Sequence, residues 1–256
     1  WQNLAVPTEA MAALAKCRYL GGVRKLALDE NLLNDGGADA LAGAPWLRTV
    51  EELSITRHPE LSGSGFAILA AQLRCVRRLY VAHCTLLDAG GRGLAAGPLP
   101  LEDLHLDTCR VEEAGVAAIF GSNILDRATR VKINRDLLGD ALLCLTPRAN
   151  LRTLELPQCS VSTDSVVALA RGGAHPALKL LDLCDNLLED AAAVALAGSS
   201  AFPVLEKLDL RANQLGPQGV IALGESTGLP ALKQLGVDGN KLFTGATHIH
   251  EWPGGM

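Results

Sequence analysis

Apolar residues return along the chain in one fixed pattern, in which a leucine or similar residue is followed by apolar residues three and five places later. The clearest unit has Leu178, Leu181 and Leu183. With the first of these called position 1, nine units begin 23 to 27 residues apart, at Val23, Val50, Val76, Leu101, Ala128, Leu151, Leu178, Leu205 and Leu232. Units this short cannot bury their own apolar side, so we expect them to stack as a solenoid.

Within each unit the pattern changes from the period of a strand to that of a helix. Positions 4 and 6 alternate with polar residues, and positions 15, 16 and 19 lie on one helical face. We therefore predict an α/β solenoid, curved like a segment of a horseshoe, with a parallel inner sheet and outer helices. Helices are predicted to cover roughly residues 38–41, 66–73, 116–120, 166–170, 191–196 and 220–224. Strands are predicted to centre near Leu26, Leu53, Leu79, Leu104, Val131, Leu154, Leu181, Leu208 and Leu235.

Position 9 holds the side chain at the turn that leaves each strand. Most units have asparagine or cysteine there: Asn31, Cys84, Cys109, Cys159, Asn186, Asn213 and Asn240. A buried side chain at this place can bond backbone groups that the turn leaves unpaired. This pattern, with units near 27 residues and an outer helix, resembles the ribonuclease-inhibitor-like class of leucine-rich repeats. Ribonuclease inhibitor, Ran GTPase-activating protein and the sensor domains of NOD-like receptors belong to that class. The resemblance covers roughly residues 1–246 and implies a leucine-rich-repeat solenoid.

Three places depart from the pattern. The second unit has His58 at position 9, followed by Pro59, which predicts a bulged turn. The fifth unit has only 23 residues, which we interpret as a deletion in preference to a notch that faces a partner. The run 90–93, Gly-Gly-Arg-Gly, lies where the third helix is expected, and we interpret it as a compressed connector and not as an anion site.

We expect a single domain over residues 1–256, with nine repeats over 23–246 and an irregular tail over 247–256. Residues 1–22 match the second half of a unit and are either a partial repeat or a cap. Because Trp1 falls at the sixth position of such a unit, we favour the partial repeat and expect a piece of a longer protein.

The seven cysteines indicate the compartment. Cys84, Cys109 and Cys159 are expected to be buried reduced thiols, and Cys184, at position 7, to be partly exposed on the inner face. An odd number of cysteines without paired caps, and the absence of Asn-x-Ser/Thr, favour a reducing, intracellular location, the cytoplasm above all. No run of about 18 apolar residues predicts a membrane span.

Motifs of catalysis are absent from the sequence. There is no Gly-x-x-x-x-Gly-Lys-Ser/Thr loop, no His-Glu-x-x-His and no Gly-x-Ser-x-Gly. The tail residues His248, His250 and Glu251 lack the fixed geometry of a metal site. We therefore expect no enzyme activity, no cofactor and no metal.

The solvent side of the inner sheet carries two charge patterns. Positions 2 and 3 of the early units alternate in sign, as in Arg24, Glu51 and Arg77, which we interpret as a cross-strand ion-pair ladder in preference to a docking strip. Alternating charge and a net charge of −5 argue against nucleic acid, whose phosphates need a face of one sign.

The later units have acidic residues in consecutive position 5 sites. Such a column either steers a basic partner or is solvated and paired with Lys179 and Lys207, and the pattern leaves both interpretations open. Aromatic side chains at position 5 of the third and fourth units can anchor a contact. The candidate contact residues are therefore Glu155, Asp182, Asp185, Asp209, Arg211, Asp238, Tyr80 and His105.

These patterns indicate a non-catalytic protein-interaction module within an intracellular protein, binding a protein partner on its concave face, without nucleic acid or membrane. The partner is expected to be basic if the acidic column is its docking surface. The resemblance implies two more specific roles, the ligand-sensing end of a NOD-like receptor and a GTPase-activating regulator similar to Ran GTPase-activating protein. A structural subunit of a large assembly is a further alternative.

Overall fold

The computed structural model describes residues 8–241 and shows a leucine-rich-repeat solenoid. Nine parallel strands pair in sequence order, with position 4 of each unit in register with position 4 of the next. The strands are β1 (Lys25–Ala27), β2 (Glu52–Thr56), β3 (Arg78–Ala82), β4 (Asp103–Asp107), β5 (Arg130–Asn134), β6 (Thr153–Glu155), β7 (Leu180–Asp182), β8 (Lys207–Asp209) and β9 (Gln234–Gly236). The predicted fold and all nine strand centres are confirmed.

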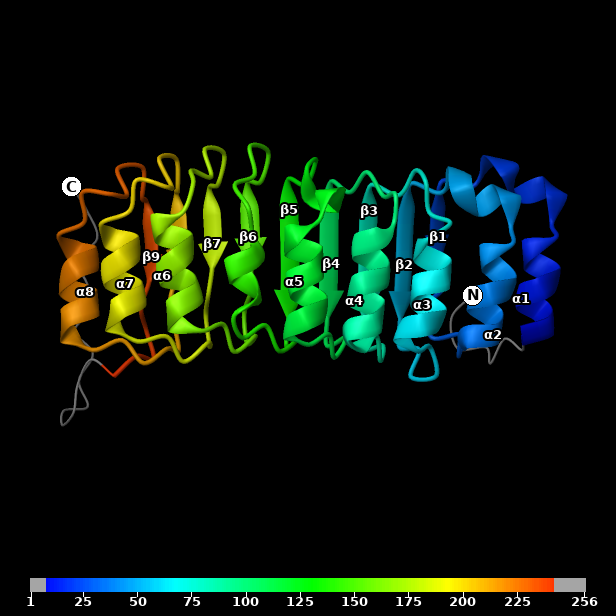
Figure 1. The fold of residues 1–256 in the computed structure, drawn as a ribbon, viewed down its shortest axis with the longest axis horizontal. Helices are drawn as coiled ribbons and strands as arrows, with labels where there is room; N and C mark the ends of the chain where they lie inside the picture. Colours follow the sequence, from blue (N-terminus) through cyan, green and yellow to red (C-terminus); the bar gives the residue numbers. More distant parts are fainter. Residues whose placement is uncertain (1–7, 242–256) are drawn as a thin grey trace.

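Helices cover one face of this sheet and leave the other open to solvent (Figure 1). The α-helices are α1 (Thr8–Ala15), α2 (Asp35–Ala42), α3 (Gly63–Ala70), α4 (Leu87–Ala96), α5 (Glu113–Gly121), α6 (Thr163–Arg171), α7 (Asp190–Ala197) and α8 (Pro217–Gly224). Short 3-10 helices are η1 (Arg18–Gly22), η2 (Pro45–Thr49), η3 (Asn123–Leu125) and η4 (Ala141–Cys144). Apolar side chains of positions 1, 4 and 6, most of them leucine, contribute to one continuous core between the two layers. The tail predicted over residues 247–256 lies outside the described residues.

The glycine run 90–93 does not form a connector, contrary to our expectation, but lies inside α4. Its glycines face the neighbouring helices, where there is no room for a side chain. A Cβ on Gly91 would lie 2.7 Å from Cα of Gly115 in α5, and one on Gly93 would lie 2.2 Å from Cβ of Ala67 in α3. The glycines therefore let three helices approach closely, at the cost of some helix propensity.

The fifth unit forms only the 3-10 helix η4 where its neighbours have an α-helix, which agrees with a deletion. The side chain of Arg148, in the connector that follows, lies in the resulting gap and is buried. Its Nη2 donates to the carbonyls of Phe120 and Ser122, each at 2.8 Å, and its Nη1 pairs with Asp126. A cation thus satisfies the carboxyl end of α5 at the place where the helix layer is thinnest.

The turn after each strand shares one backbone feature in all nine units. Position 8 has a positive φ in all nine units: Glu30, Arg57, His83, Thr108, Arg135, Gln158, Asp185, Ala212 and Gly239. This conformation directs the position 8 N–H to the position 7 carbonyl of the next unit, as from Arg57 to Ala82 at 2.9 Å. The ladder of backbone hydrogen bonds therefore continues through the turn.

Position 9 then closes the turn with two kinds of hydrogen bond. The Asn186 Nδ2 donates to the carbonyl of Leu156 in the preceding unit at 2.8 Å, and its Oδ1 accepts from the N–H groups of Cys159 and Val161 at 3.0 Å. His58 performs both functions with an imidazole, because Nδ1 accepts from the Leu33 N–H at 2.9 Å and Nε2 bonds the Leu28 carbonyl. Burial lowers the pKa of His58, which favours the neutral ring that this arrangement needs.

Cysteine and aspartate at position 9 each form only one of these two kinds of hydrogen bond. The thiol of Cys159 donates to the carbonyl of Ile133 at 3.2 Å, and those of Cys84 and Cys109 donate to the equivalent carbonyls of their preceding units. Asp136 accepts from the Val111 N–H at 3.2 Å, but its Oδ2 is buried without a hydrogen-bond partner. Burial raises the pKa of Asp136 to about 6.

The thiols differ in accessibility, which predicts their order of reaction with a maleimide. All seven cysteines are free: Cys75 and Cys144 are exposed, Cys17 and Cys184 are half-buried, and the three at position 9 are buried. Burial, followed by the charge of Asp182, raises the pKa of Cys184 to about 12, so its thiolate is scarce at neutral pH. We expect Cys75 and Cys144 to react first, Cys184 later, and Cys84, Cys109 and Cys159 only on unfolding. Mass spectrometry of time-quenched samples gives the order, and labelling of Cys109 as fast as Cys184 would contradict the assignment of position 9.

Candidate functional site

The open face of the sheet presents one row of side chains from position 5 of each unit. Strand pairing places these residues side by side across the whole sheet, so neighbours in the row come from adjacent strands. In order from β1 to β9 the row is Ala27, Ser54, Tyr80, His105, Lys132, Glu155, Asp182, Asp209 and Gly236. It therefore passes from small residues through an aromatic pair and a lysine to three acids.

Tyr80 and His105 form the aromatic part of this row. Their ring centroids lie 4.6 Å apart with the planes at 73°, an edge-to-face contact. The Tyr80 residue is 36% exposed. Burial, and then the nearby charge of Lys132, lowers the pKa of His105, so the ring is neutral at pH 7. The pair borders a shallow hollow of about 440 Å³ over β1 to β5.

Ion pairs between adjacent strands surround this hollow, as the alternating pattern predicts. Lys25 and Arg78 both pair with Glu52, the first at 3.0 Å. The outer row contains the pair of Arg24 with Glu51 at 3.5 Å and that of Arg77 with Glu102 at 2.6 Å. Each charge has an opposite neighbour, so the rim of the hollow is held in place and has little net field.

The acidic column, for which the sequence left a docking surface and internal pairing both open, is partly compensated by cations of the protein itself. Glu155 pairs with Arg130 at 2.9 Å and lies 3.8 Å from the Lys132 ammonium. Asp209 is buried and forms a bidentate pair with Arg211, whose Nη2 donates at 2.6 Å. Burial acts to raise the pKa of Asp209, but the bonds from Arg211 outweigh it and the pKa is lowered. Two members of the column are therefore neutralised within the protein.

The remaining acids keep their charge available to solvent. Asp182 accepts a hydrogen bond from the Cys184 N–H at 3.0 Å, and Asp185 accepts one from Gln158 at 2.8 Å. Asp238 is exposed near the end of the described chain. No ion pair engages these three acids within residues 8–241.

Of the two lysines proposed as partners for the column, Lys207 contributes its charge to lowering the pKa of Asp209, whereas Lys179 pairs elsewhere. Lys179 pairs with Glu206 at 2.8 Å, because both are at position 2 of adjacent units and lie one row away from position 5. Lys132 is the residue that the sequence analysis missed. Its place at position 5 between His105 and Glu155 was readable from the repeat pattern alone.

The described residues offer no arrangement for metal binding or for crossing a membrane. Over residues 8–241, no three or more His, Cys, Asp or Glu side chains are placed to hold a metal ion. Over the same range, no helix is long and apolar enough to span a bilayer. The tail residues His248, His250 and Glu251 lie outside the described residues.

Comparisons with known proteins agree with this fold. A family model described as "Leucine Rich repeat" matches residues 203–224, which form most of the eighth unit. No curated protein matches the sequence. The chain therefore has the leucine-rich-repeat fold, a fold that typically mediates protein–protein interaction and is generally not catalytic.

Two solved structures match the chain to different extents. One is an internalin from Listeria monocytogenes, 20% identical with a TM-score of 0.55, where the match covers 91% of this chain and 65% of the internalin. The chain thus spans about two thirds of that protein, and this likeness concerns the fold alone. The other is the yeast complex of Rad7 and Elc1, 15% identical, with a TM-score of 0.32 and coverage of 95% of this chain and 86% of that chain.

Proposed function

We propose that this chain is a non-catalytic interaction module that binds a protein partner on the open face of its sheet. The observation that carries the proposal is the Tyr80–His105 pair beside the hollow over β1 to β5. Aromatic side chains that are rigid and half exposed are the residues that most often anchor protein contacts. The ion pairs around them fix the shape of the surface without repelling a partner of either sign.

The acidic end of the row supports a partner that carries basic groups. Asp182 on the open face, together with Asp185 and Asp238 just beyond the ends of β7 and β9, offers carboxylates that no ion pair of the described chain neutralises. Two ion pairs beside these acids, one made by Glu155 and one between Asp209 and Arg211, keep the contact surface ordered. The partner is expected to place an apolar group against Tyr80 and a Lys or Arg near Asp182.

We further propose that the units belong to the ribonuclease-inhibitor-like class and that the protein is intracellular, in the cytoplasm. An α-helix in most units and unit lengths near 27 support the class. Support for a reducing compartment comes from the position 9 thiols, which donate hydrogen bonds to carbonyls and therefore contribute to the fold as thiols.

Replacement of Tyr80 tests the anchor. Tyr80→Ala is expected to reduce recovery of the natural partner about tenfold or more, because a truncated anchor leaves its pocket unfilled. The measurement is a quantitative pull-down from the native source, compared by mass spectrometry with wild type. Ile68→Ala, which removes an equally exposed apolar side chain from α3 on the helix side, is the matched control. Equal recovery by the Tyr80 and Ile68 variants would move the contact away from the open face.

The acidic end needs a separate variant. Asp182→Asn is expected to slow association with the recovered partner, and more strongly at low salt, because exposed charges are screened beyond about 8 Å at physiological ionic strength. Asp209 is unsuitable for this test, because Asp209→Asn breaks a buried pair with Arg211 and weakens the fold. Association rates that are the same for wild type and Asp182→Asn at all salt concentrations would remove Asp182 from the contact surface.

A further inference from the structure

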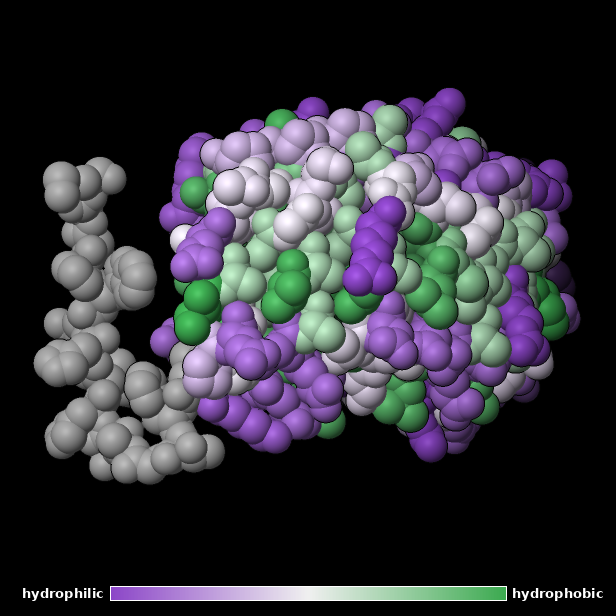
Figure 2. Space-filling view, turned by 60° about the vertical axis from the view of Figure 1, so that its left-hand side comes forward, coloured by the Kyte–Doolittle hydropathy of each residue, from purple (hydrophilic) through white to green (hydrophobic). Residues whose placement is uncertain are grey.

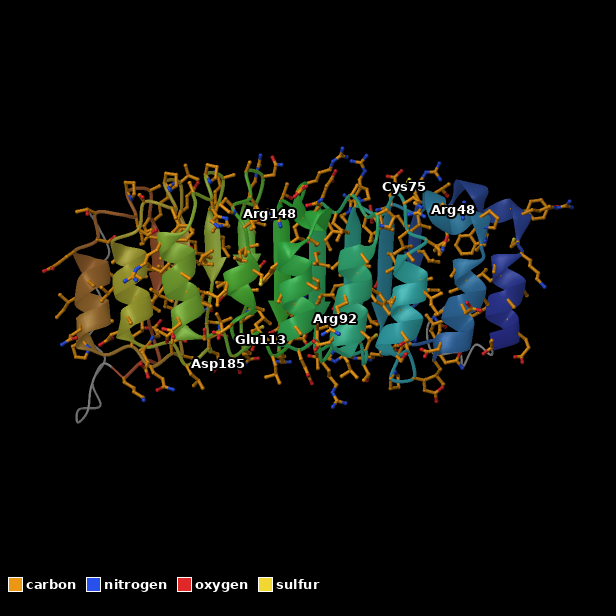
Figure 3. All side chains as sticks on the ribbon, viewed as in Figure 1. Arg48, Cys75, Arg92, Glu113, Arg148 and Asp185 are labelled. Carbon is orange, nitrogen blue, oxygen red and sulfur yellow. The ribbon has the colours of Figure 1, made fainter. Side chains whose placement is uncertain are left out.

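The two long edges of the solenoid differ in charge. All described strands run in the same direction and every α-helix runs back, so one edge collects the strand starts and the other collects the strand ends and helix starts. Arg48 and Arg148 lie at the strand-start edge, and Glu113 and Asp185 lie at the strand-end edge (Figure 3). Over the helices between these edges lies a more apolar band (Figure 2).

The acids of the strand-end edge have a structural explanation. Asp35, Asp88 and Asp190 lie in the first turns of their helices, where the partial positive charge of the helix favours an anion. Each also accepts from the next unit: Asp35 from the Ser62 N–H at 2.8 Å, Asp88 from Gly115 at 2.7 Å, and Asp190 from Gly216 at 2.6 Å. These carboxylates join adjacent units, so this edge needs no partner to explain it.

The arginines of the strand-start edge lack such an explanation. Arg48, Arg74, Arg127 and Arg152 are exposed, come from four different connectors, and have no ion pair within residues 8–241. None of the four lies in the last turn of an α-helix, where a cation would complement the helix dipole. Within residues 8–241, the only side-chain hydrogen bond of these four arginines is a long one of 3.4 Å from Arg48 to Gln72.

Other cations on the same edge are neutralised by ion pairs within the fold. Arg24 pairs with Glu51, Arg77 pairs with Glu102, and Lys179 and Lys233 share Glu206. The four exposed arginines therefore remain as a set of guanidinium groups whose charge nothing in the described fold offsets. Guanidinium groups bind carboxylates through two parallel hydrogen bonds, which makes them suited to acidic ligands.

We propose that the strand-start edge, through Arg48, Arg74, Arg127 and Arg152, is a second docking surface and takes an extended acidic segment of a partner protein. Arg48 and Arg74 come from consecutive connectors, as do Arg127 and Arg152, and the connector between these two pairs has no cation. With successive units about 5–10 Å apart and about 3.3 Å per residue of extended chain, the segment needs a carboxylate every two to three residues. This surface is distinct from the open face and does not depend on the function proposed for it.

Overall charge favours an acidic protein segment over a nucleic acid. The net charge is −5, and the opposite edge is acidic, whereas a nucleic-acid-binding domain has a basic charge as a whole. A long polyanion that extends past the arginines would meet the field of the acidic edge and the acidic end of the open face. A short segment confined to the strand-start edge would not.

Peptide binding to the whole chain tests the proposal. The probe is a fluorescent 12-residue peptide with glutamate at every third position, and its analogue with glutamine at those positions is the control ligand. The edge variant combines Arg48→Gln, Arg74→Gln, Arg127→Gln and Arg152→Gln. The matched variant combines Arg57→Gln, Arg92→Gln, Arg110→Gln and Arg135→Gln, which removes the same charge from other exposed arginines of the chain. Circular dichroism of both variants establishes that they are folded.

We expect the acidic peptide to bind wild type and the matched variant within a factor of two of each other, and the edge variant at least tenfold more weakly. Affinity is expected to fall as salt rises, and the glutamine analogue is expected not to bind. Equal weakening in both variants would show a general charge effect and overturn the proposal, as would an absence of peptide binding to wild type. Tighter binding of a single-stranded oligonucleotide through the same arginines would replace the proposed partner with nucleic acid. Self-association in sedimentation that the edge variant abolishes would replace it with the acidic edge of a second copy.

Discussion

Asp136→Asn is expected to stabilise the protein by about 1–3 kcal/mol at pH 8. The aspartate occupies a position where asparagine both accepts and donates, and its Oδ2 is buried without a partner. In the asparagine variant this atom becomes an NH₂ group that can donate to the preceding unit, as Asn186 does to Leu156 at 2.8 Å. The gain is that of removing a buried, incompletely bonded charge.

The effect is expected to depend on pH with a defined sign. The pKa of Asp136 is raised from 3.8 to about 6 in the folded protein, so the folded state binds the proton more tightly than the unfolded chain. The wild type therefore has its full stability below about pH 4 and loses part of it as the pH rises through about 6. A shift of about two pKa units corresponds to at most about 3 kcal/mol. The advantage of Asp136→Asn should accordingly grow from pH 4 to pH 8.

Urea unfolding followed by circular dichroism at pH 4, 6 and 8 measures this dependence. Asp39→Asn, which changes an exposed aspartate in α2, is the control and is expected to shift the free energy of unfolding by less than about 0.5 kcal/mol at each pH. An Asp136→Asn variant that is less stable than wild type at pH 8, or whose advantage is constant with pH, would disprove this account of position 9.

Arg148→Met is expected to cost about 2–4 kcal/mol of stability. The variant keeps most of the apolar stem but leaves the carbonyls of Phe120 and Ser122 without donors and Asp126 without its partner. Its neighbour His175 is also affected, because burial and then the Arg148 charge lower the pKa of that imidazole. Removal of the charge is expected to move the His175 pKa upward, which NMR titration of the ring detects.

An exposed arginine four residues along the chain provides the comparison. Arg152→Met removes the same group from the connector without breaking a buried bond, so its cost is expected to stay within about 0.5 kcal/mol. Arg148→Lys is expected to fall between the two, because one ammonium cannot reproduce the fork that reaches two carbonyls and a carboxylate. Equal unfolding midpoints for Arg148→Met and Arg152→Met would show that the gap in the fifth unit needs no cation.

The repeat pattern predicts most of this fold because the strand period recurs in nine units and the helical period in most of them. Leu26 and Leu235 lie at opposite ends of the sheet, yet both follow from one alignment of position 4. Helix α4 was missed because the low helix propensity of glycine was given more weight than position in the repeat. Its glycines are required by the neighbouring helices, and those contacts become visible only in three dimensions.

The open face was harder to predict, because its charges depend on which partners the side chains reach. The pair of Glu155 with Arg130 joins positions 5 and 3 of adjacent units and follows from side-chain length and direction. The pair of Asp209 with Arg211 was within reach of sequence reasoning, since residues two apart on a strand share a face. The burial of Asp209 beneath Arg211 could not be predicted from the sequence.

The left-handed turn at position 8 has a consequence for how such a chain can change in length. Its N–H must meet a carbonyl of the next unit, as from Asp185 to Arg211 at 2.9 Å, so the interval from position 1 to position 8 has the same length in every unit. All variation from 23 to 27 residues falls after that turn, in the helices and connectors. Single-residue insertions are therefore excluded from one third of each unit, whereas duplication or loss of an entire unit preserves every turn. A protein of this kind can therefore lengthen its surface by duplication of whole units in its gene, without any change to the existing turns.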